Sequence, residues 1–156
     1  MQYFRLYEKL EGRSPLGFGK AAGRWNNSGT PMIYCSNVLS LCMLEHYAIR
    51  GSVVSTINWE LATFEIEEEV PFIEKLDLPK DWTARPYPEP TRNFGSTWVT
   101  QNIGFCVAVP SIRIPLFRFP EEHNLLINPL HPDIKSYIRL VDTKEINFEI
   151  NNVVVQ

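Results

Sequence analysis

The sequence predicts an α+β fold with a mixed β-sheet core and one major buried helix. Segments with strand character outnumber helical ones, and they do not alternate with helices in the regular order of βαβ units. Only residues 37–50 combine helical periodicity with the length of a main helix. The chain has 156 residues, enough for one core of its own, so we expect a single domain over residues 1–156.

The N-terminal part begins with a strand and continues into a turn-rich loop. Residues 3–10 alternate partly between apolar and polar side chains, which is typical of a strand. Residues 12–25 are rich in glycine, and the following "NNSGTP" combines residues that favour turns. The run "MIYCS", residues 32–36, is predicted to be a short buried strand.

Residues 36–51, "SNVLSLCMLEHYAIRG", give the clearest helical pattern in the chain. Ser36 or Asn37 can cap the N-terminus, and Gly51 can end the helix. Apolar side chains occupy opposite sides of this helix, so we expect it to be largely buried. One narrow sector of the helix holds Val38, Leu41, Cys42, Glu45 and Ile49.

The second half of the chain has further strands and an irregular region. Residues 70–93 are rich in proline, and we expect a surface excursion that acts as a lid or a partner surface. Residues 95–102, "GSTWVTQN", are predicted to start a short helix with Ser96 as its cap. The other segments with strand character are 53–67 (one or two strands), 104–110, 123–134 (a strand and a turn) and 136–150.

The composition argues against several classes of function. A net charge of −3 disfavours a protein that binds the phosphate backbone of nucleic acids. No apolar run approaches the ~20 residues of a membrane span, and the N-terminus does not resemble a signal peptide. The three cysteines lie in apolar surroundings without a CxxC pair, which indicates reduced thiols and a cytoplasmic location. Because histidine and cysteine lack metal-ligand spacing, we expect no metal.

Two charged residues are candidates for a functional site. Glu45 lies at the centre of the predicted apolar face, where an unpaired carboxylate is strongly destabilising. It is therefore half of an ion pair, an exposed side chain, or a catalytic or ligand-binding carboxylate in a cleft. Arg24 stands at the mouth of the turn-rich loop, where turn formation requires no arginine. Its planar guanidinium matches a phosphate or a carboxylate, and the alternative is a solvated loop arginine.

Four uncharged residues complete the set of candidates. Tyr34 is either a core tyrosine or a ring that stacks on a flat heterocycle. Trp25 either packs in the core or forms a wall of a pocket, and Asn26 beside it is a candidate ligand contact within the turn. Ser111 follows a predicted strand and a proline, so its hydroxyl either forms a turn or points into a pocket.

Four motifs in this order resemble the RES-domain toxins of bacterial toxin–antitoxin pairs: "GRWNNSGTPMIYCS", "SLCMLE", "VAVPSIRIP" and "HNLLINPLHPDI". The resemblance runs from about residue 5 to about residue 134, and the ordered set carries it rather than any single motif. That family is named for an arginine, a glutamate and a serine. The matching positions here are Arg24, Glu45 and Ser111, with Tyr34 as a further pocket residue.

The resemblance implies a fold similar to that of the mono-ADP-ribosyltransferases and a reaction on NAD⁺ without a metal. Glu45 would stabilise the positive charge that develops when nicotinamide leaves, and Arg24 would hold the pyrophosphate. Tyr34 would stack on nicotinamide or adenine. Ser111 would bind the nicotinamide amide or position the nucleophile. The remaining expected cofactor contacts are Trp25 and Asn26.

Three functions remain open at this point. The first is a toxin that degrades NAD⁺ by hydrolysis or phosphorolysis and depletes the cell of it. The second is a protein mono-ADP-ribosyltransferase with the same pocket, and the third is a non-catalytic NAD⁺-binding module. The resemblance further implies a helix-turn-helix (Xre-type) antitoxin as partner, within a multimeric toxin–antitoxin complex.

Overall fold

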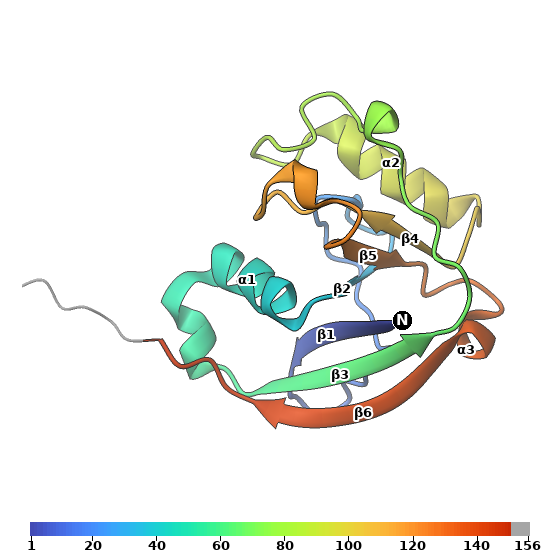
Figure 1. Ribbon diagram of the computed structural model, residues 1–156. Helices are drawn as coiled ribbons and strands as arrows, with labels where there is room; N and C mark the ends of the chain where they lie inside the picture. The colour runs from blue at the N-terminus through green and yellow to red at the C-terminus, as the bar shows by residue number, and fades with distance from the viewer. Residues whose placement is uncertain (151–156) are drawn as a thin grey trace, which may run out of the picture.

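The computed structural model describes residues 1–150, which form a six-stranded sheet with helices packed around it (Figure 1). The strand order is β4-β5-β2-β1-β3-β6. The α+β class is confirmed, but each pair of neighbouring strands is antiparallel, so the sheet is not mixed. Within residues 1–150, the parallel pairing is limited to an isolated bridge between Phe72 and Ala108. The strands are β1 (Gln2–Glu8), β2 (Ile33–Ser36), β3 (Trp59–Ile66), β4 (Cys106–Val109), β5 (Asn124–Ile127) and β6 (Ile138–Ile146).

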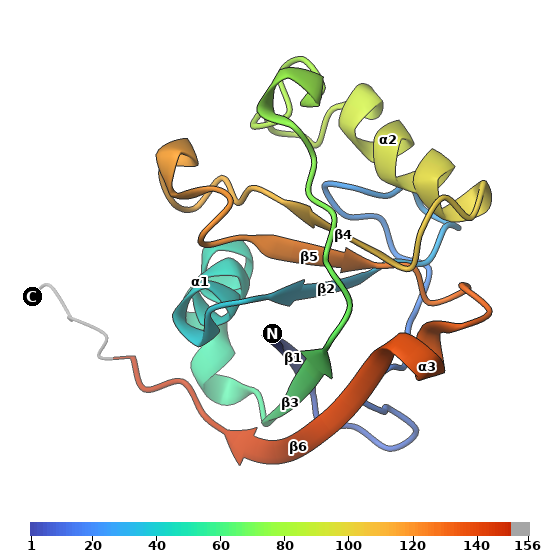
Figure 2. The same cartoon turned by 45° about the vertical axis from the view of Figure 1, so that its right-hand side comes forward.

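The sheet consists of two halves that meet at β1 and β2. Strand β1 pairs with β3 along its whole length, but with β2 only at Phe4 and Ser36. The two halves therefore diverge, as Figure 2 shows. Helix α1 (Leu39–Arg50) follows β2 directly and contacts both β1 and β2, so it lies at this junction.

Two groups of buried apolar side chains stabilise the fold. The larger one includes β4 and β5, where all residues of β4 and three of the four in β5 are buried. The smaller one lies under α1 and includes Leu6, Cys42 and Trp59. Full burial of one large apolar side chain contributes about 1.5–3 kcal/mol. The three cysteines are free and buried, as predicted.

Helix α1 ends as predicted but begins differently. Gly51 has a φ of 61° and terminates it, a conformation that glycine adopts without steric penalty. The N-cap is Val38, which makes no side-chain capping bond, so the predicted caps Ser36 and Asn37 are wrong. Ser36 Oγ donates to Asn124 instead, and Asn37 Nδ2 donates to a loop carbonyl. Long-range hydrogen bonds thus take both side chains away from the helix end.

The burial of α1 is narrower than predicted. Only Leu41 and Cys42 of this helix are buried, whereas Tyr47 and Ile49 are 43% and 57% exposed. The other side of α1 faces solvent, because the sheet covers one face of the helix only. Glu45 lies between these two regions, at the border of the buried face.

Helix α2 (Glu89–Thr100) is longer than the short helix predicted there. It begins inside the proline-rich region, with Pro90 in its first turn, where proline needs no backbone hydrogen bond. Ser96 therefore lies within the helix and does not cap it; its Oγ accepts a hydrogen bond from the Asn27 backbone N–H over 2.8 Å. Gly95 faces the turn-rich loop at very short range, because a Cβ there would lie 1.6 Å from the Trp25 carbonyl oxygen.

The remaining elements are short. Residues expected to begin a strand form the 3₁₀ helix η1 (Gly51–Thr56), so only the later part of 53–67 is a strand. The other short helices are η2 (Lys75–Asp77), η3 (Leu116–Arg118) and α3 (Ile134–Tyr137). Among the described helices, none has the length and apolar character of a membrane span.

Candidate active site

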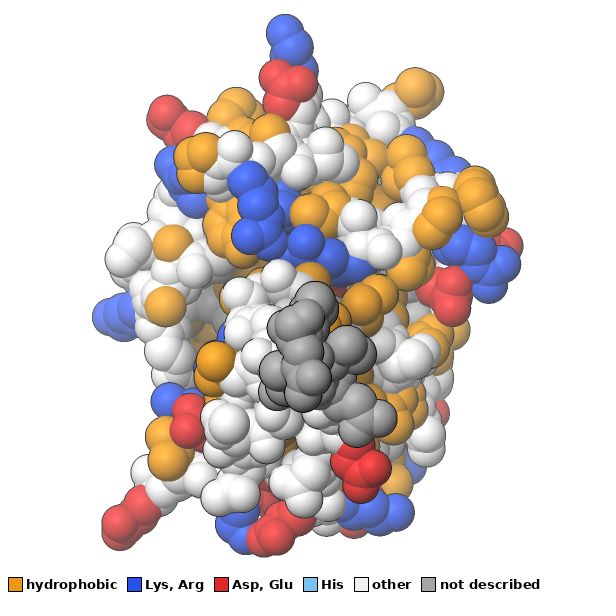
Figure 3. Space-filling model, turned by 90° about the vertical axis from the view of Figure 1, so that its left-hand side faces the viewer, with side chains coloured by type: hydrophobic (Ala, Val, Ile, Leu, Met, Phe, Trp, Pro, Cys, Tyr) orange, Lys and Arg blue, Asp and Glu red, His pale blue; other side chains and the backbone are white. Residues whose placement is uncertain are grey.

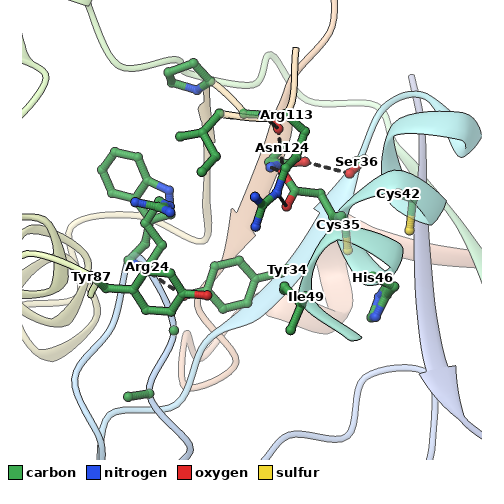
Figure 4. A pocket seen from close by; sticks show the side chains of 17 residues that line it. Arg24, Tyr34, Cys35, Ser36, Cys42, His46, Ile49, Tyr87, Arg113 and Asn124 are labelled. Atoms are coloured by element: carbon green, nitrogen blue, oxygen red, sulfur yellow. Dashed lines mark hydrogen bonds and ion pairs between the residues drawn. The ribbon is translucent and has the colours of Figure 1, made fainter. Parts of the chain in front are cut away.

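A cavity of about 310 Å³ opens between α1, β2 and the segment that follows β4 (Figure 4). This volume lies at the lower end of the ~300–1,000 Å³ of small-molecule sites. Five of the six candidate residues line it, although they come from three separate parts of the chain. These five are Arg24, Trp25, Tyr34, Glu45 and Ser111, whereas Asn26 is not among the lining residues.

Glu45 is held in the cavity wall by three donors. Ser111 Oγ donates to Glu45 Oε1 over 2.5 Å, and Asn124 Nδ2 donates to the same oxygen over 2.7 Å. Arg113 Nε forms an ion pair with Oε2 at 3.3 Å. The Glu45 side chain stays 23% exposed, so the carboxylate is both partnered and accessible from the cavity.

A second layer of hydrogen bonds fixes the direction of these donors. Ser36 Oγ donates to Asn124 Oδ1 over 2.7 Å, so the Asn124 amide nitrogen faces Glu45. The Arg113 backbone N–H donates to Ser111 Oγ over 3.0 Å, which leaves the Ser111 hydroxyl hydrogen for Glu45. An ionised carboxylate can only accept hydrogen bonds, so it matches this set of donors. The wall therefore presents a negative charge in a fixed position.

Arg24 lies beside Tyr87 on another side of the same cavity (Figure 4). Its Nη1 donates to the carbonyl oxygens of Trp82 and Ala84, at 2.6 and 3.0 Å. Its guanidinium carbon lies 4.7 Å from the centre of the Tyr87 ring. Burial lowers the pKa of Arg24, and the nearby positive charge of Arg113 acts in the same direction. Nη2 is buried and has no hydrogen-bond partner within residues 1–150.

Tyr34 presents its ring to the cavity while its hydroxyl is anchored in the turn-rich loop. The hydroxyl donates to Asn26 Oδ1 and accepts from the Trp25 backbone N–H over 3.2 Å. Burial of the hydroxyl end raises the pKa of Tyr34, although the residue as a whole is 36% exposed. The two properties belong to different parts of the side chain, because the ring borders the open cavity and the loop encloses the hydroxyl.

Asn26 and Trp25 support the loop from within. Asn26 is 1% exposed, and its amide donates to the carbonyls of Ala21 and Thr30, each over 2.9 Å. The Trp25 ring packs against Trp82 and Phe94, with centroid distances of 6.1 and 5.7 Å. The structure thus places the Trp25 ring in the core and the Asn26 side chain behind Tyr34.

The sequence-based candidates did not include Arg113, Asn124 and Tyr87, which also line the cavity. Arg113 stands two positions after Ser111, so its basic side chain close to a candidate serine was a usable signal. Asn124 reaches the site because β5 pairs with β2 and places it opposite Ser36. Tyr87 comes from the proline-rich region, where no periodicity predicts a position.

Several buried side chains near Glu45 are neutral at pH 7. Burial lowers the pKa of His46 to about 4, and the positive charge of Arg50 adds to this effect. Burial raises the pKa of the Cys35 and Cys42 thiols to about 12. No group of three or more His, Cys, Asp or Glu in the described part of the chain is arranged to hold a metal ion.

The lining of the cavity thus combines the carboxylate of Glu45, the guanidinium groups of Arg24 and Arg113, and the rings of Tyr34 and Tyr87. Such a site can bind an anion at Arg24 and stabilise positive charge that develops near Glu45. Figure 3 shows a band of Lys and Arg side chains across one face of the molecule, next to hydrophobic side chains. A local basic surface attracts anions even though the net charge is −3.

Comparison with known sequences shows which protein family the chain matches. A family model described as the RES domain matches residues 3–149. A "Prs ADP-ribosylating toxin" from Sphingobium sp. (strain YBL2) is 33% identical over 135 residues, which cover 84% of this chain and 80% of that protein. A "Toxin Res" from Yersinia enterocolitica is 30% identical over 128 residues, which cover 81% of each protein.

A solved structure has a similar fold. It is a chain in the M. tuberculosis MbcT–MbcA toxin–antitoxin complex, with a TM-score of 0.68. The match covers 94% of the chain described here and 84% of that chain, at 15% sequence identity. At this identity the similarity concerns the fold.

Proposed function

Because the chain belongs to the RES domain family, we propose that it is the toxin of a toxin–antitoxin pair and acts by cleaving NAD⁺. The bond that breaks joins nicotinamide to ribose, and the consequence is depletion of cellular NAD⁺. The names of the relatives from Sphingobium and Yersinia support the toxin assignment. One observation carries the chemistry: Glu45, held by three donors, faces the same cavity as Arg24.

In the proposed complex Arg24 binds the pyrophosphate of NAD⁺. Guanidinium pairs with phosphate oxygens through parallel N–H donors, and Arg24 Nη2 is a buried donor without a partner within residues 1–150. A phosphate oxygen supplies the missing acceptor once the Arg24 side chain turns Nη2, which is closed to solvent in this structure, toward the cavity. Tyr34 offers an aromatic face to the nicotinamide or adenine ring, since its hydroxyl is fixed and its ring borders the cavity.

Glu45 acts on the ribose in the proposed reaction. The bond between ribose C1′ and the nicotinamide nitrogen breaks, and its electron pair leaves with nicotinamide, which becomes neutral. The ribose passes through an oxocarbenium-like state that carries the positive charge. The Glu45 carboxylate stabilises this charge from a fixed position. In hydrolysis a water oxygen then bonds to C1′ and releases a proton, so the products are nicotinamide, ADP-ribose and H⁺.

Ser111, Asn124 and Arg113 serve the proposed reaction by positioning Glu45. Their three donors leave the carboxylate little freedom to rotate, and a preorganised group needs no rearrangement in the transition state. Ser111 lines the cavity as well, so its hydroxyl can also contact the nicotinamide amide or the nucleophile.

A second candidate function uses the same pocket with another acceptor. The Sphingobium relative is named an ADP-ribosylating toxin, which favours transfer of ADP-ribose to a protein as the alternative to hydrolysis or phosphorolysis. In that reaction a side chain of the target protein bonds to C1′ in place of water or phosphate. The contacts of Arg24, Tyr34 and Glu45 with NAD⁺ would be the same.

The proposed partner is a helix-turn-helix (Xre-type) antitoxin that blocks the cavity within a multimeric complex in the cytoplasm. The M. tuberculosis chain of similar fold lies in a toxin–antitoxin complex, which supports a partner of this general kind. The toxin and its antitoxin are therefore best expressed together, with the toxin purified away for assays.

Incubation of the purified chain with NAD⁺ alone tests this proposal. Stoichiometric release of nicotinamide and ADP-ribose is expected for hydrolysis, and addition of phosphate would reveal phosphorolysis as ADP-ribose 1″-phosphate. If label from adenylate-labelled NAD⁺ appears only on an added protein, the second candidate replaces the first. If NAD⁺ stays intact with water, phosphate and bacterial extract, the catalytic proposal is wrong.

A further inference from the structure

The proline-rich region supplies one wall of the cavity through Tyr87. Tyr87 stands between Pro86 and Pro88, and each proline ring fixes its own φ angle. A residue that precedes proline is also restricted to extended backbone, which applies to both Tyr87 and Arg85. Tyr87 is therefore presented on a stiff stretch of chain.

Arg24 and its neighbour Trp25 hold this segment at one end. Arg24 Nη1 donates to the Trp82 and Ala84 carbonyl oxygens. The Trp82 ring stacks on Trp25, with 29° between the ring planes. The turn-rich loop and the proline-rich segment are thus connected by two independent contacts next to the cavity.

Arg92 of α2 holds the segment at Tyr87 itself. Its Nη1 donates to the Tyr87 carbonyl oxygen, and its Nε donates to Asn27 Oδ1 over 3.0 Å. Asn27 belongs to the same turn-rich loop as Arg24. The backbone of Tyr87 is therefore tied to the loop that carries Arg24, and its ring lies against the guanidinium.

The Tyr87 ring brings two arginines together. The guanidinium carbon of Arg24 lies 4.7 Å from the ring centre and that of Arg85 lies 5.6 Å from it. The positive charges of these two guanidinium groups repel each other, and a bound anion would offset this repulsion. Arg24 Nη1 is already engaged, while Nη2 has no partner in the described part of the chain. An anionic ligand would satisfy this buried donor.

We infer that Tyr87 is a positioning residue that acts through Arg24. The Tyr87 ring holds the Arg24 guanidinium at the cavity, so that little side-chain entropy is lost when the guanidinium binds a ligand anion. The proline-rich region thereby builds the anion-binding side of the cavity. This inference rests on the proposed function, because it takes the anion to be the pyrophosphate of NAD⁺.

Binding of ADP-ribose, measured by calorimetry, tests this role. Tyr87→Leu is expected to weaken ADP-ribose binding about 3- to 30-fold, the range of a cation–π contact. Tyr87→Phe keeps the ring and is expected to restore most of the affinity, which also separates this effect from a loss of folding. Phe117→Leu is the matched control, because that ring is 75% exposed and does not line the cavity.

Two further readouts separate action through Arg24 from direct contact. Binding of nicotinamide riboside, which lacks the pyrophosphate, should be the same in Tyr87→Leu and wild type. In an Arg24→Ala background, Tyr87→Leu should cause no further loss of ADP-ribose affinity. The inference is wrong if nicotinamide riboside binding falls equally, or if the losses from the two substitutions simply add.

Failure of the inference and failure of the proposed function give different results. If the wild type neither binds ADP-ribose nor releases nicotinamide, the proposed function is wrong. If the wild type does both, and Arg24→Ala loses affinity while Tyr87→Leu binds like the wild type, only the role of Tyr87 is wrong.

The expected result is a higher KM for NAD⁺ in Tyr87→Leu, with kcat within about threefold of wild type.

Discussion

Ser111 Oγ donates a hydrogen bond to Glu45 Oε1, although 66 residues separate them in the sequence. Ser111 follows the end of β4, and Glu45 lies on α1, which follows β2. Strand β5 stands between β4 and β2 and contributes Asn124 to the same carboxylate. The antiparallel order of these three strands therefore assembles the charged wall of the cavity.

We predict that Ser111→Ala lowers kcat for NAD⁺ about 10- to 100-fold, because a hydrogen bond to a charged group contributes about 1.5–3 kcal/mol. Ser111 also accepts a hydrogen bond from the Arg113 backbone N–H, so the substitution affects two of the three partners of the Glu45 carboxylate. Steady-state kinetics of nicotinamide release measure the change. Ser55→Ala is the control, because the Ser55 hydroxyl is exposed and bonds only within its own turn. Equal kcat values for the two variants would show that Ser111 does not contribute to the reaction.

Asn26→Ala is predicted to lower the free energy of unfolding by about 2–4 kcal/mol. The substitution leaves the Ala21 and Thr30 carbonyls without this donor and the Tyr34 hydroxyl without its acceptor. Urea unfolding measures the loss, with the exposed Asn58→Ala as control. Unchanged stability together with a higher KM for NAD⁺ would instead identify Asn26 as a ligand contact, as the sequence-based expectation had it.

Gly95→Ala is predicted to destabilise the protein by about 3 kcal/mol, the upper end of the usual range for overpacking. The added Cβ would lie 1.6 Å from the Trp25 carbonyl oxygen, so α2 and the turn-rich loop must separate. A lower melting temperature and weaker NAD⁺ binding are both expected, because Arg24 belongs to that loop. Gly19→Ala is the control, since a Cβ at Gly19 has no neighbour within 4 Å. Two variants of equal stability would contradict this packing.

The stability of the wild type is predicted to fall between pH 6.5 and about pH 4 through His46. Burial keeps His46 neutral in the folded state down to about pH 4, whereas the unfolded chain binds the proton near the ordinary pKa of 6.5. Urea unfolding of wild type and His46→Gln across this window should give a shallower loss for the variant, by roughly 1–3 kcal/mol at the acid end. A residual slope is expected from His123, whose pKa burial also lowers. Parallel pH profiles would exclude His46 as the source.

Local sequence patterns predicted those elements that nearby residues alone specify. Alternation and apolar runs identified the strand that contains Tyr34 and the strand that ends before Ser111, and Gly51 marked the end of α1. The predicted caps Ser36 and Asn37 were wrong because hydrogen bonds from distant strands and loops compete for their side chains. The start of α2 was missed because prolines suggest irregular chain, although Pro90 fits the first turn of a helix.

The sequence identified some residues of the candidate site but not how they are arranged in space. Residue type and local context singled out Glu45 and Arg24, and the structure brings both to one cavity. Asn124 and Tyr87 could not be found in this way, because strand pairing places the first and the route of an irregular segment places the second. Such positions depend on contacts between distant parts of the chain, which periodicity does not encode.

The kinetics of Glu45→Gln test the central claim most directly. Glutamine keeps the size of the side chain but removes the negative charge that the proposed mechanism places near the ribose. We predict that kcat for nicotinamide release falls about 10²- to 10³-fold, while NAD⁺ still binds at Arg24. Glu68→Gln, a change at an exposed glutamate outside the cavity, should match the wild type. NAD⁺ binding with equal turnover in Glu45→Gln and wild type would contradict the catalytic role of Glu45, and NAD⁺ binding without turnover in either would indicate a non-catalytic binding module.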